Sequence, residues 1–227
     1  MQPVEYAVIA AAGIGSRLGH GMPKCMLEIG GVTLLSRLIH VLEPVVRRIH
    51  VVVGYREEMI VDLVSRRHRN VVLVRNPHYR TTNTAQSMAL GARGCKGKIL
   101  FLDGDLLIEP RSLMSFVSFS ADSDLTIGVT PSISENPVYA HTTSAPGGSM
   151  IVTGFSRTDA SSLEWANVFS GNAQFLDEEK DYVFNRLERH LPAVAFPLNL
   201  REVDTVADLV EAKRFAQELA AIQDVSK

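Results

Sequence analysis

The stretch that decides the fold is VEYAVIAAAGIGSRLGHGMPK, which runs from residue 4 to residue 24. Its first part, Val4–Ala11, is a continuous apolar run typical of a strand buried on both faces of a sheet. Gly13 and Gly15 then end the run in a loop. A glycine-rich loop after a strand leaves backbone N–H groups free to bind an anion, so the stretch predicts a phosphate-binding turn.

The spacing of the glycines excludes two familiar phosphate-binding loops. The dinucleotide pattern G-x-G-x-x-G fits the first two glycines, Gly13 and Gly15. The third glycine, Gly19, comes one residue too late for it. That pattern also needs an acid at the end of the second strand, where residues 54–56 read GYR. No Lys-Ser or Lys-Thr pair follows the glycines, so the Walker loop is excluded as well.

The loop instead carries two cations, Arg17 inside it and Lys24 immediately after Pro23. A guanidinium and an ammonium beside free backbone N–H groups suit a highly charged ligand such as a triphosphate. The alternative from the residues alone is a tight strand-to-helix turn with solvated cations.

The first half of the chain alternates between two kinds of segment. We expect strands at 4–11, 49–55, 71–77 and 98–105, and helices at 33–43, 57–67 and 84–93. This alternation predicts an α/β fold with a three-layer, mostly parallel, Rossmann-like sheet. Ligands bind at the carboxyl ends of the strands in such sheets.

The pattern changes between residues 130 and 170, where Ser, Thr, Pro and Gly are frequent. We expect irregular loops and short antiparallel strands there, forming an insert or lid over one end of the sheet. Regular structure is expected to resume with a helix at 176–191, a strand at 193–204 and a helix at 205–222. The whole chain, 1–227, is interpreted as one domain.

The composition of the chain limits the classes of partner that it is expected to bind. The chain has 227 residues, 46% of them hydrophobic, and a formal net charge of −2. That charge predicts no nucleic acid and no membrane as partner. The two cysteines and the absence of a signal-peptide pattern or a long apolar run predict a cytoplasmic protein. A homodimer is one assembly that the chain could form.

At this point the residues resemble a family. The stretches AAGIGSRLG and MPKCMLEIGG look like the signature A-A-G-x-G-x-R-[LM]-x(n)-P-K of nucleotidyltransferases that make NDP-sugars, CDP-alcohols and related compounds. The similarity extends to LLSRLIHVLE, VVVGYREEMI, LFLDGD and REVDTVADLVEAKRF. NPHYRTTNTAQSMALG and the motif E-x-D-T look most similar to the phosphocholine and aminoethylphosphonate cytidylyltransferase branch.

The resemblance implies an enzyme that transfers CMP from CTP to a small phosphorylated alcohol or phosphonate and releases pyrophosphate, with Mg²⁺ as cofactor. Because the acceptor oxygen is already ionised near pH 7, the chemistry needs positioning and cations rather than a general base. Arg17 and Lys24 are the expected catalytic residues. A sugar 1-phosphate acceptor with another nucleotide is the alternative, and a non-catalytic nucleotide sensor is a third reading.

The nucleotide is expected to lie against the first loop and the segment TTNTAQSM. The expected nucleotide-binding residues are Ala11, Ala12, Gly13, Gly15, Ser16, Arg17, Gly54, Thr82, Asn83, Ser87 and Asp103. The resemblance favours cytosine and implies that Ser87 contacts it. The competing interpretation of Thr84 and Ser87 is ordinary capping of a helix.

Carboxylates occur in two pairs, each with its members two residues apart. We expect Asp105, Glu202 and Asp204 to hold the Mg²⁺, with Asp103 nearby, because Mg²⁺ prefers hard oxygen ligands. The residues alone leave two other roles open, a turn for Asp105 and a helix cap for Asp204. A shared ion requires the carboxylates of Asp105 and Asp204 to lie within about 10 Å.

The acceptor is expected to contact Lys24, Glu164, Trp165 and Asn167, so that residues 130–170 form an acceptor-side insert. An aromatic ring with a nearby acid suits a quaternary ammonium group. The alternative is that Trp165 simply packs inside the insert.

Overall fold

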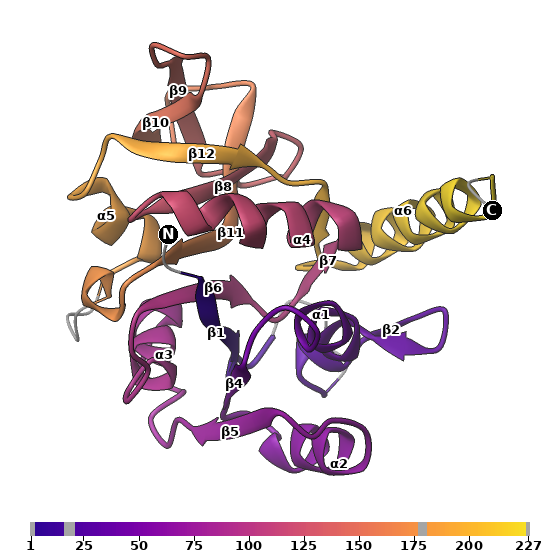
Figure 1. The fold of residues 1–227 in the computed structure, drawn as a ribbon. Coiled ribbons are helices and arrows are strands. Elements are labelled where there is room, and N and C mark those ends of the chain that lie inside the picture. Colours follow the sequence, from indigo (N-terminus) through magenta and orange to yellow (C-terminus); the bar gives the residue numbers. More distant parts are fainter. Residues whose placement is uncertain (1–2, 16–20, 177–180, 226–227) are drawn as a thin grey trace.

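The computed structural model describes residues 3–15, 21–176 and 181–225 (Figure 1). A nine-stranded sheet forms its centre, and the strand pairings show that seven strands run in one direction while β10 and β11 run opposite. In spatial order the strands are β5 (Val71–Arg75), β4 (Arg48–Val53), β1 (Val4–Ala11), β6 (Lys98–Asp103), β11 (Leu163–Gly171), β8 (Thr126–Pro131), β12 (Ala193–Pro197), β10 (Met150–Ser156) and β9 (Tyr139–Ser144).

Helices cover both faces of this sheet. The helices are α1 (Leu34–Leu42), α2 (Glu57–Arg67), α3 (Thr84–Gly91), α4 (Pro110–Phe119), α5 (Val183–Glu188) and α6 (Val206–Val225). Buried side chains of α1, α2 and α4 form one core with the sheet, and those of α3 and α5 form a second core. Two cores with a sheet between them confirm the expected three-layer α/β fold.

The apolar periodicity of the sequence explains helix α1. Leu34, Leu35, Leu38, Ile39 and Leu42 are each at most 2% exposed, and they recur at the spacing of one helix face. The hydroxyl of Thr33 accepts a hydrogen bond from the N–H of Ser36 at 3.1 Å and so caps the helix. The helix therefore begins one residue after the expected start.

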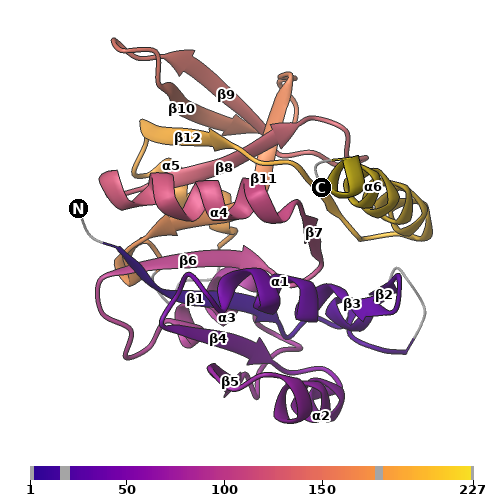
Figure 2. The same cartoon turned by 45° about the vertical axis from the view of Figure 1, so that its right-hand side comes forward.

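The antiparallel strands expected between residues 130 and 170 are present as β9, β10 and β11. They are longer and more buried than the sequence suggested, because β11 lies between β6 and β8 inside the main sheet (Figure 2). Phe101 of β6 stacks on Phe169 of β11 with ring centroids 4.6 Å apart. The region is thus continuous with the core of the domain.

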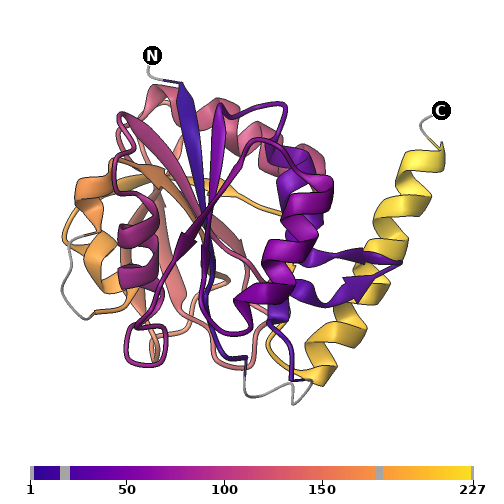
Figure 3. The same cartoon turned by 90° about the horizontal axis from the view of Figure 1, so that it is seen from below.

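Later in the chain, the expected helix at 176–191 is limited to α5, and residues 177–180 lie outside the described part of the chain. Helix α4 was not anticipated. Helix α6 packs beside a small hairpin, β2 (Glu28–Ile29) and β3 (Val32–Thr33), away from the main sheet (Figure 3). Within the described residues, no helix combines the length and apolar character needed to cross a membrane.

Candidate active site

Two distant segments meet through a short antiparallel ladder. Strand β7 (Leu106–Ile108) pairs with β13 (Leu200–Glu202), with Leu106 opposite Glu202. One residue later, the N–H of Val203 donates to the carbonyl of Asp105 at 3.1 Å. The ladder therefore brings together the residues that follow β6 and those that precede α6.

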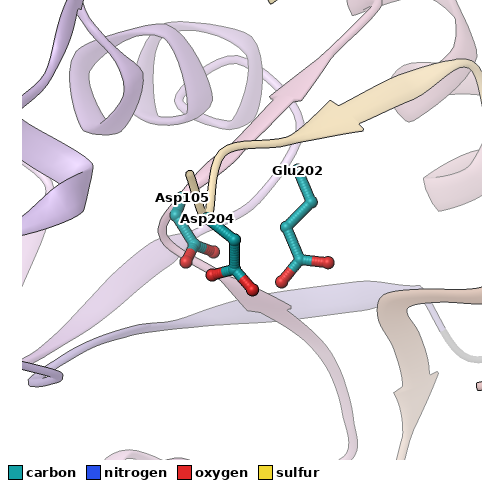
Figure 4. A group of neighbouring side chains, drawn as sticks. All are labelled: Asp105, Glu202 and Asp204. Carbon is teal, nitrogen blue, oxygen red and sulfur yellow. The ribbon is translucent and has the colours of Figure 1, made fainter. Parts of the chain in front are cut away.

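This ladder gathers three carboxylates. One oxygen from each of Asp105, Glu202 and Asp204 lies within 4.8 Å of the other two, and the side chains point into a common space (Figure 4). The requirement of about 10 Å between Asp105 and Asp204 is satisfied. Hard oxygen donors at this separation can surround one divalent cation.

Lys24 contacts the same cluster. Its Nζ donates to Oδ2 of Asp105 at 3.3 Å and to Oδ1 of Asp204. Burial alone would lower the pKa of Lys24, but the neighbouring carboxylates of Asp105 and Asp204 outweigh it and raise the pKa. Lys24 is therefore a stable ammonium at neutral pH.

Two other carboxyl groups of this region, Asp103 and Glu202, have strongly perturbed pKa values. Burial, followed by the charge of Asp105, raises the pKa of Asp103 well above its ordinary value. Burial and the neighbouring carboxylates raise the pKa of Glu202 to about 9. Oδ1 of Asp103 and Oδ1 of Asp105 are buried without a hydrogen-bond partner among the described residues. These oxygens and the gathered carboxyl groups fit a divalent cation such as Mg²⁺.

A first pocket of about 420 Å³ opens at the carboxyl ends of β1 and β6, as expected for a ligand site in this fold. We call it the nucleotide-side pocket, and define it by its lining residues. They are Ala10, Ala11, Ala12, Gly13, Ile14, Gly15, Lys24, Cys25, Tyr79, Thr82, Asn83, Thr84, Ala85, Ser87, Asp103, Gly104, Asp105, Tyr182 and Val183. Two further residues of the predicted site, Ser16 and Arg17, lie outside the described residues.

A buried asparagine organises one wall of the nucleotide-side pocket. Nδ2 of Asn76 donates to Oγ1 of Thr82 at 2.9 Å and to Oγ of Ser87 at 3.0 Å. Asn83 caps α3, because its Oδ1 accepts from the N–H of Gln86 at 3.0 Å. Ser87 lines the pocket and is not the cap of α3. The sequence interpretation missed Asn76, whose signal was its place at the end of a strand, before a proline.

Gly54 is near the nucleotide-side pocket but does not line it. A Cβ at this position would lie 2.6 Å from Cβ of Tyr79 and 3.0 Å from the carbonyl oxygen of Ala12. The N–H of Tyr55 donates to that same carbonyl at 3.2 Å. Glycine here lets the end of β4 contact the first loop and Tyr79, which does line the pocket, so its effect on a ligand is indirect.

A second pocket of about 560 Å³ lies on the other side of the carboxylate cluster. We call it the acceptor-side pocket. Its lining residues are Thr130, Ile133, Ser134, Glu135, Asn136, Val138, Arg157, Glu164, Trp165, Ala166, Asn167, Leu200, Arg201, Glu202, Asp204, Thr205, Asp208 and Glu211. The predicted Glu164, Trp165 and Asn167 all line it, whereas Lys24 lines the nucleotide-side pocket.

Glu164, Trp165 and Asn167 each make a different contact in the wall of this pocket. Nδ2 of Asn167 donates to Oε2 of Glu202 at 3.0 Å and so helps to orient a carboxylate of the cluster. The carboxylate of Glu164 accepts from the hydroxyl of Ser134 at 2.5 Å and holds the loop that forms the pocket rim. The ring of Trp165 packs edge-on against Phe155, with centroids 5.9 Å apart. Trp165 thus combines the packing role with a place in the pocket wall.

The fold agrees with comparisons to known proteins. The family model of the MobA-like NTP transferase domain matches residues 7–148. The bifunctional protein GlmU of Neisseria meningitidis serogroup A is 34% identical over 134 residues, covering 57% of this chain and 28% of that protein. CMP-5'-(3-aminopropyl)phosphonate synthase of Streptomyces rubellomurinus is 31% identical over 113 residues, covering 47% of this chain and 18% of that protein.

The solved structure of CTP:phosphocholine cytidylyltransferase from Streptococcus pneumoniae is similar to nearly the whole chain. Its TM-score is 0.71 at 18% identity, and the match covers 95% of this chain and 100% of that one. The chain spans about a third or less of the length of the curated relatives named above. The family model covers well over half of the chain and begins within β1. The chain therefore belongs to the family of MobA-like NTP transferase domains, and is a nucleotidyltransferase domain, as its first loop predicted.

Proposed function

We propose that this domain transfers CMP from CTP to a small phosphorylated alcohol or phosphonate, of the size of phosphocholine or aminoethylphosphonate. The observation that carries the proposal is the position of the charged cluster between two pockets. Lys24 and Asp105 line the nucleotide-side pocket, and Glu202 and Asp204 line the acceptor-side pocket. Two ligands bound in these pockets would meet at the cluster.

The reaction joins two anions. An oxygen of the acceptor's phosphate or phosphonate attacks the α-phosphorus of CTP, the bond from that phosphorus to the bridging oxygen breaks, and pyrophosphate leaves with the electron pair. The attacking oxygen carries its own negative charge near pH 7, so the protein need not remove a proton. The task that remains is to hold the reactants in line and to offset their charge.

The residues divide this task between them. The half-buried ammonium of Lys24 supplies positive charge where the phosphates of the nucleotide would lie. Asp105, Glu202 and Asp204 would hold a Mg²⁺ ion, which supplies charge neutralisation and orientation of phosphate oxygens when it is bound. Arg17 is proposed as a second phosphate-binding cation from the first loop.

Cytosine is the base we propose for the nucleotide-side pocket. Ser87, held by Asn76, presents a hydroxyl beside the backbone of Ala12 and Gly13, where a base edge can form hydrogen bonds. Support comes from the similar CTP:phosphocholine cytidylyltransferase and from the CMP-phosphonate synthase relative. The second candidate is a sugar 1-phosphate nucleotidyltransferase using another NTP, because the 560 Å³ acceptor-side pocket has room for a hexose phosphate.

Pyrophosphate release tests the proposal. The protein is incubated with Mg²⁺, each of the four common NTPs and one of three acceptors: phosphocholine, 2-aminoethylphosphonate or glucose 1-phosphate. We expect turnover with CTP and one of the first two acceptors, and a CDP-linked or CMP-linked product by mass spectrometry. A reaction without acceptor is the control, because pyrophosphate that forms without an acceptor does not come from the transfer. No turnover with any pair would favour the nucleotide-sensing alternative.

A further inference from the structure

The two pockets are joined by a small third cavity of about 110 Å³, which we call the connecting compartment. It shares four lining residues with each neighbour. Thr84, Asp103, Tyr182 and Val183 also line the nucleotide-side pocket, and Val138, Arg157, Trp165 and Asn167 also line the acceptor-side pocket. The three cavities therefore form one crevice, and Arg157 is the basic residue at the junction between the connecting compartment and the acceptor-side pocket.

Arg157 is held at this junction by aromatic contacts. Its guanidinium carbon lies 5.3 Å from the ring centroid of Tyr182 and 5.0 Å from that of Phe184. These two rings stack on each other with centroids 5.5 Å apart and planes 14° from parallel. A guanidinium over stacked rings is positioned by cation–π attraction while its N–H groups stay available to a ligand.

The turn that carries Arg157 is also fixed. Arg157 follows directly after β10, and the hydroxyl of Ser156 accepts hydrogen bonds from the N–H groups of Thr158 at 3.1 Å and Asp159 at 2.8 Å. The backbone on both sides of Arg157 is thereby held in place.

The carboxyl groups of the acceptor-side pocket make a cation at Arg157 important for binding an anion. Six carboxyl side chains among the described residues line the acceptor-side pocket, and those that are ionised would repel an anionic acceptor: Glu135, Glu164, Glu202, Asp204, Asp208 and Glu211. Among the described residues, the pocket has one other arginine, Arg201, whose Nη1 is already occupied because it donates to the carbonyl of Leu200 at 2.7 Å. Arg157 is therefore the better placed of the two to bind an anion.

We infer that Arg157 binds the phosphoryl or phosphonyl group of the acceptor, and that Tyr182 and Phe184 are positioning residues for its guanidinium. This inference rests on the proposed function, because it assigns the anionic end of the acceptor to one part of the acceptor-side pocket. A guanidinium can donate hydrogen bonds to two oxygens of such a group at once. It also offsets the negative charge of the acceptor, which the ionised carboxyl groups of the pocket would otherwise repel.

Binding can be measured without turnover. Trp165, the only tryptophan in the chain, lines the same two cavities as Arg157, so its fluorescence reports on a ligand there. Methylphosphonate is titrated into the full chain at fixed Mg²⁺. We expect a saturable change in the wild type and a dissociation constant at least tenfold higher in Arg157→Gln. The control Arg214→Gln removes an exposed guanidinium that pairs with Glu218, and it should bind like the wild type.

A double variant tests whether Tyr182 and Phe184 position the guanidinium of Arg157. Tyr182→Leu combined with Phe184→Leu should weaken methylphosphonate binding by a smaller factor than Arg157→Gln, and Arg157→Lys should fall between the wild type and Arg157→Gln. No saturable response in the wild type, or equal binding by the wild type and Arg157→Gln, would overturn the inference.

Kinetics separate this inference from the proposed function. In Arg157→Gln, the KM for the acceptor should rise at least tenfold while the KM for CTP changes by less than twofold. An equal rise in both constants would indicate a structural defect and overturn the inference. If no pair of substrates turns over in the wild type, the proposed function fails, and the fluorescence titration still decides whether Arg157 binds the anion.

Discussion

The nucleotide-side pocket and the acceptor-side pocket meet at the carboxylate cluster but are lined by different kinds of residue. The first consists largely of backbone and small side chains, contributed by residues 10–15 and 82–87. The second is lined by long charged and aromatic side chains such as Arg157, Trp165 and Glu211. A backbone surface suits a ligand part common to many substrates, such as a phosphate chain, whereas a side-chain surface can be changed to suit one acceptor.

The difference also determines how much each pocket tolerates substitution. Gly15 has a φ of +63°, and a Cβ there would lie 2.8 Å from Cγ of Lys24. A larger residue would therefore strain the backbone and displace a side chain of the cluster. Arg157 and Glu211 are exposed, and neither has the positive φ that restricts Gly15. We expect the acceptor-side pocket to accept substitutions that change specificity without loss of the fold.

The largest expected effect lies where the two pockets join. Asp105→Asn removes a carboxylate from the cluster and a partner from Lys24, so turnover should fall by about 100-fold to 1,000-fold, the scale of losing an electrostatic stabiliser. Pyrophosphate release measures the loss, and circular dichroism confirms the fold. Asp62→Asn is the matched control, because Asp62 is an exposed residue of α2 paired with Arg66. Turnover within tenfold of the wild type would remove Asp105 from the mechanism.

Lys24→Ala tests the cation that lines the nucleotide-side pocket and contacts the cluster. The half-buried ammonium is replaced by a methyl group, so turnover should fall by about 100-fold, which corresponds to about 2.7 kcal/mol in the barrier. Lys213→Ala, at an exposed position of α6, serves as control. A near-normal rate in a folded Lys24→Ala would show that the phosphates of the nucleotide lie away from this ammonium.

The same contrast explains what the sequence could predict. The glycine- and alanine-rich run at 11–15 and the polar segment at 82–87 are each continuous in the sequence, so both could be proposed as parts of a nucleotide site, and residues of both line the nucleotide-side pocket. The four leucines and the isoleucine of α1 likewise gave that helix within one residue. Local patterns of this kind carry their information in adjacent or regularly spaced residues.

Long-range pairings carry no such local pattern. The ladder of β7 and β13 brings Asp105 to Asp204, and the two motifs suggested a shared ion but not the strands that join them. The place of β11 between β6 and β8 depends on pairing partners that the Ser- and Thr-rich region does not specify. Asn76 was missed because a single buried asparagine looks like any turn residue until its partners are known.

The stability of the cluster should depend on pH in a defined direction. Burial and neighbouring carboxylates raise the pKa of Glu202 from 4.5 to about 9, so the folded protein keeps a proton that the unfolded chain releases. The folded state binds more protons between these values, so the free energy of unfolding should fall as pH rises. Thermal unfolding at pH 7.0 and 8.5 measures this fall. The window lies above the lowered pKa of His68 and below the titration of Cys25, whose thiol pKa burial raises.

A variant and a metal ion show whether the carboxylate cluster causes this fall in stability. Glu202→Gln should lessen the fall, because the amide does not titrate. Mg²⁺ should raise the melting temperature at pH 8.5 by several degrees, on the order of 1–3 kcal/mol, because a bound cation favours the ionised carboxylates. Melting temperatures that rise from pH 7.0 to 8.5 without metal would contradict the assigned direction of the shift.

The smallest effect separates the two pockets most cleanly. Ser87→Ala removes one hydroxyl from the nucleotide-side pocket and leaves its neighbour Asn76 bonded to Thr82. The loss of one hydrogen bond to the base should raise the KM for CTP about tenfold, or about 1.4 kcal/mol, and should leave the KM for the acceptor unchanged. Ser118→Ala, at an exposed position of α4, is the control. Because Ser87 lines only the nucleotide-side pocket among the three cavities, a change confined to the acceptor constant would mean that the two ligands occupy the pockets in the reverse order.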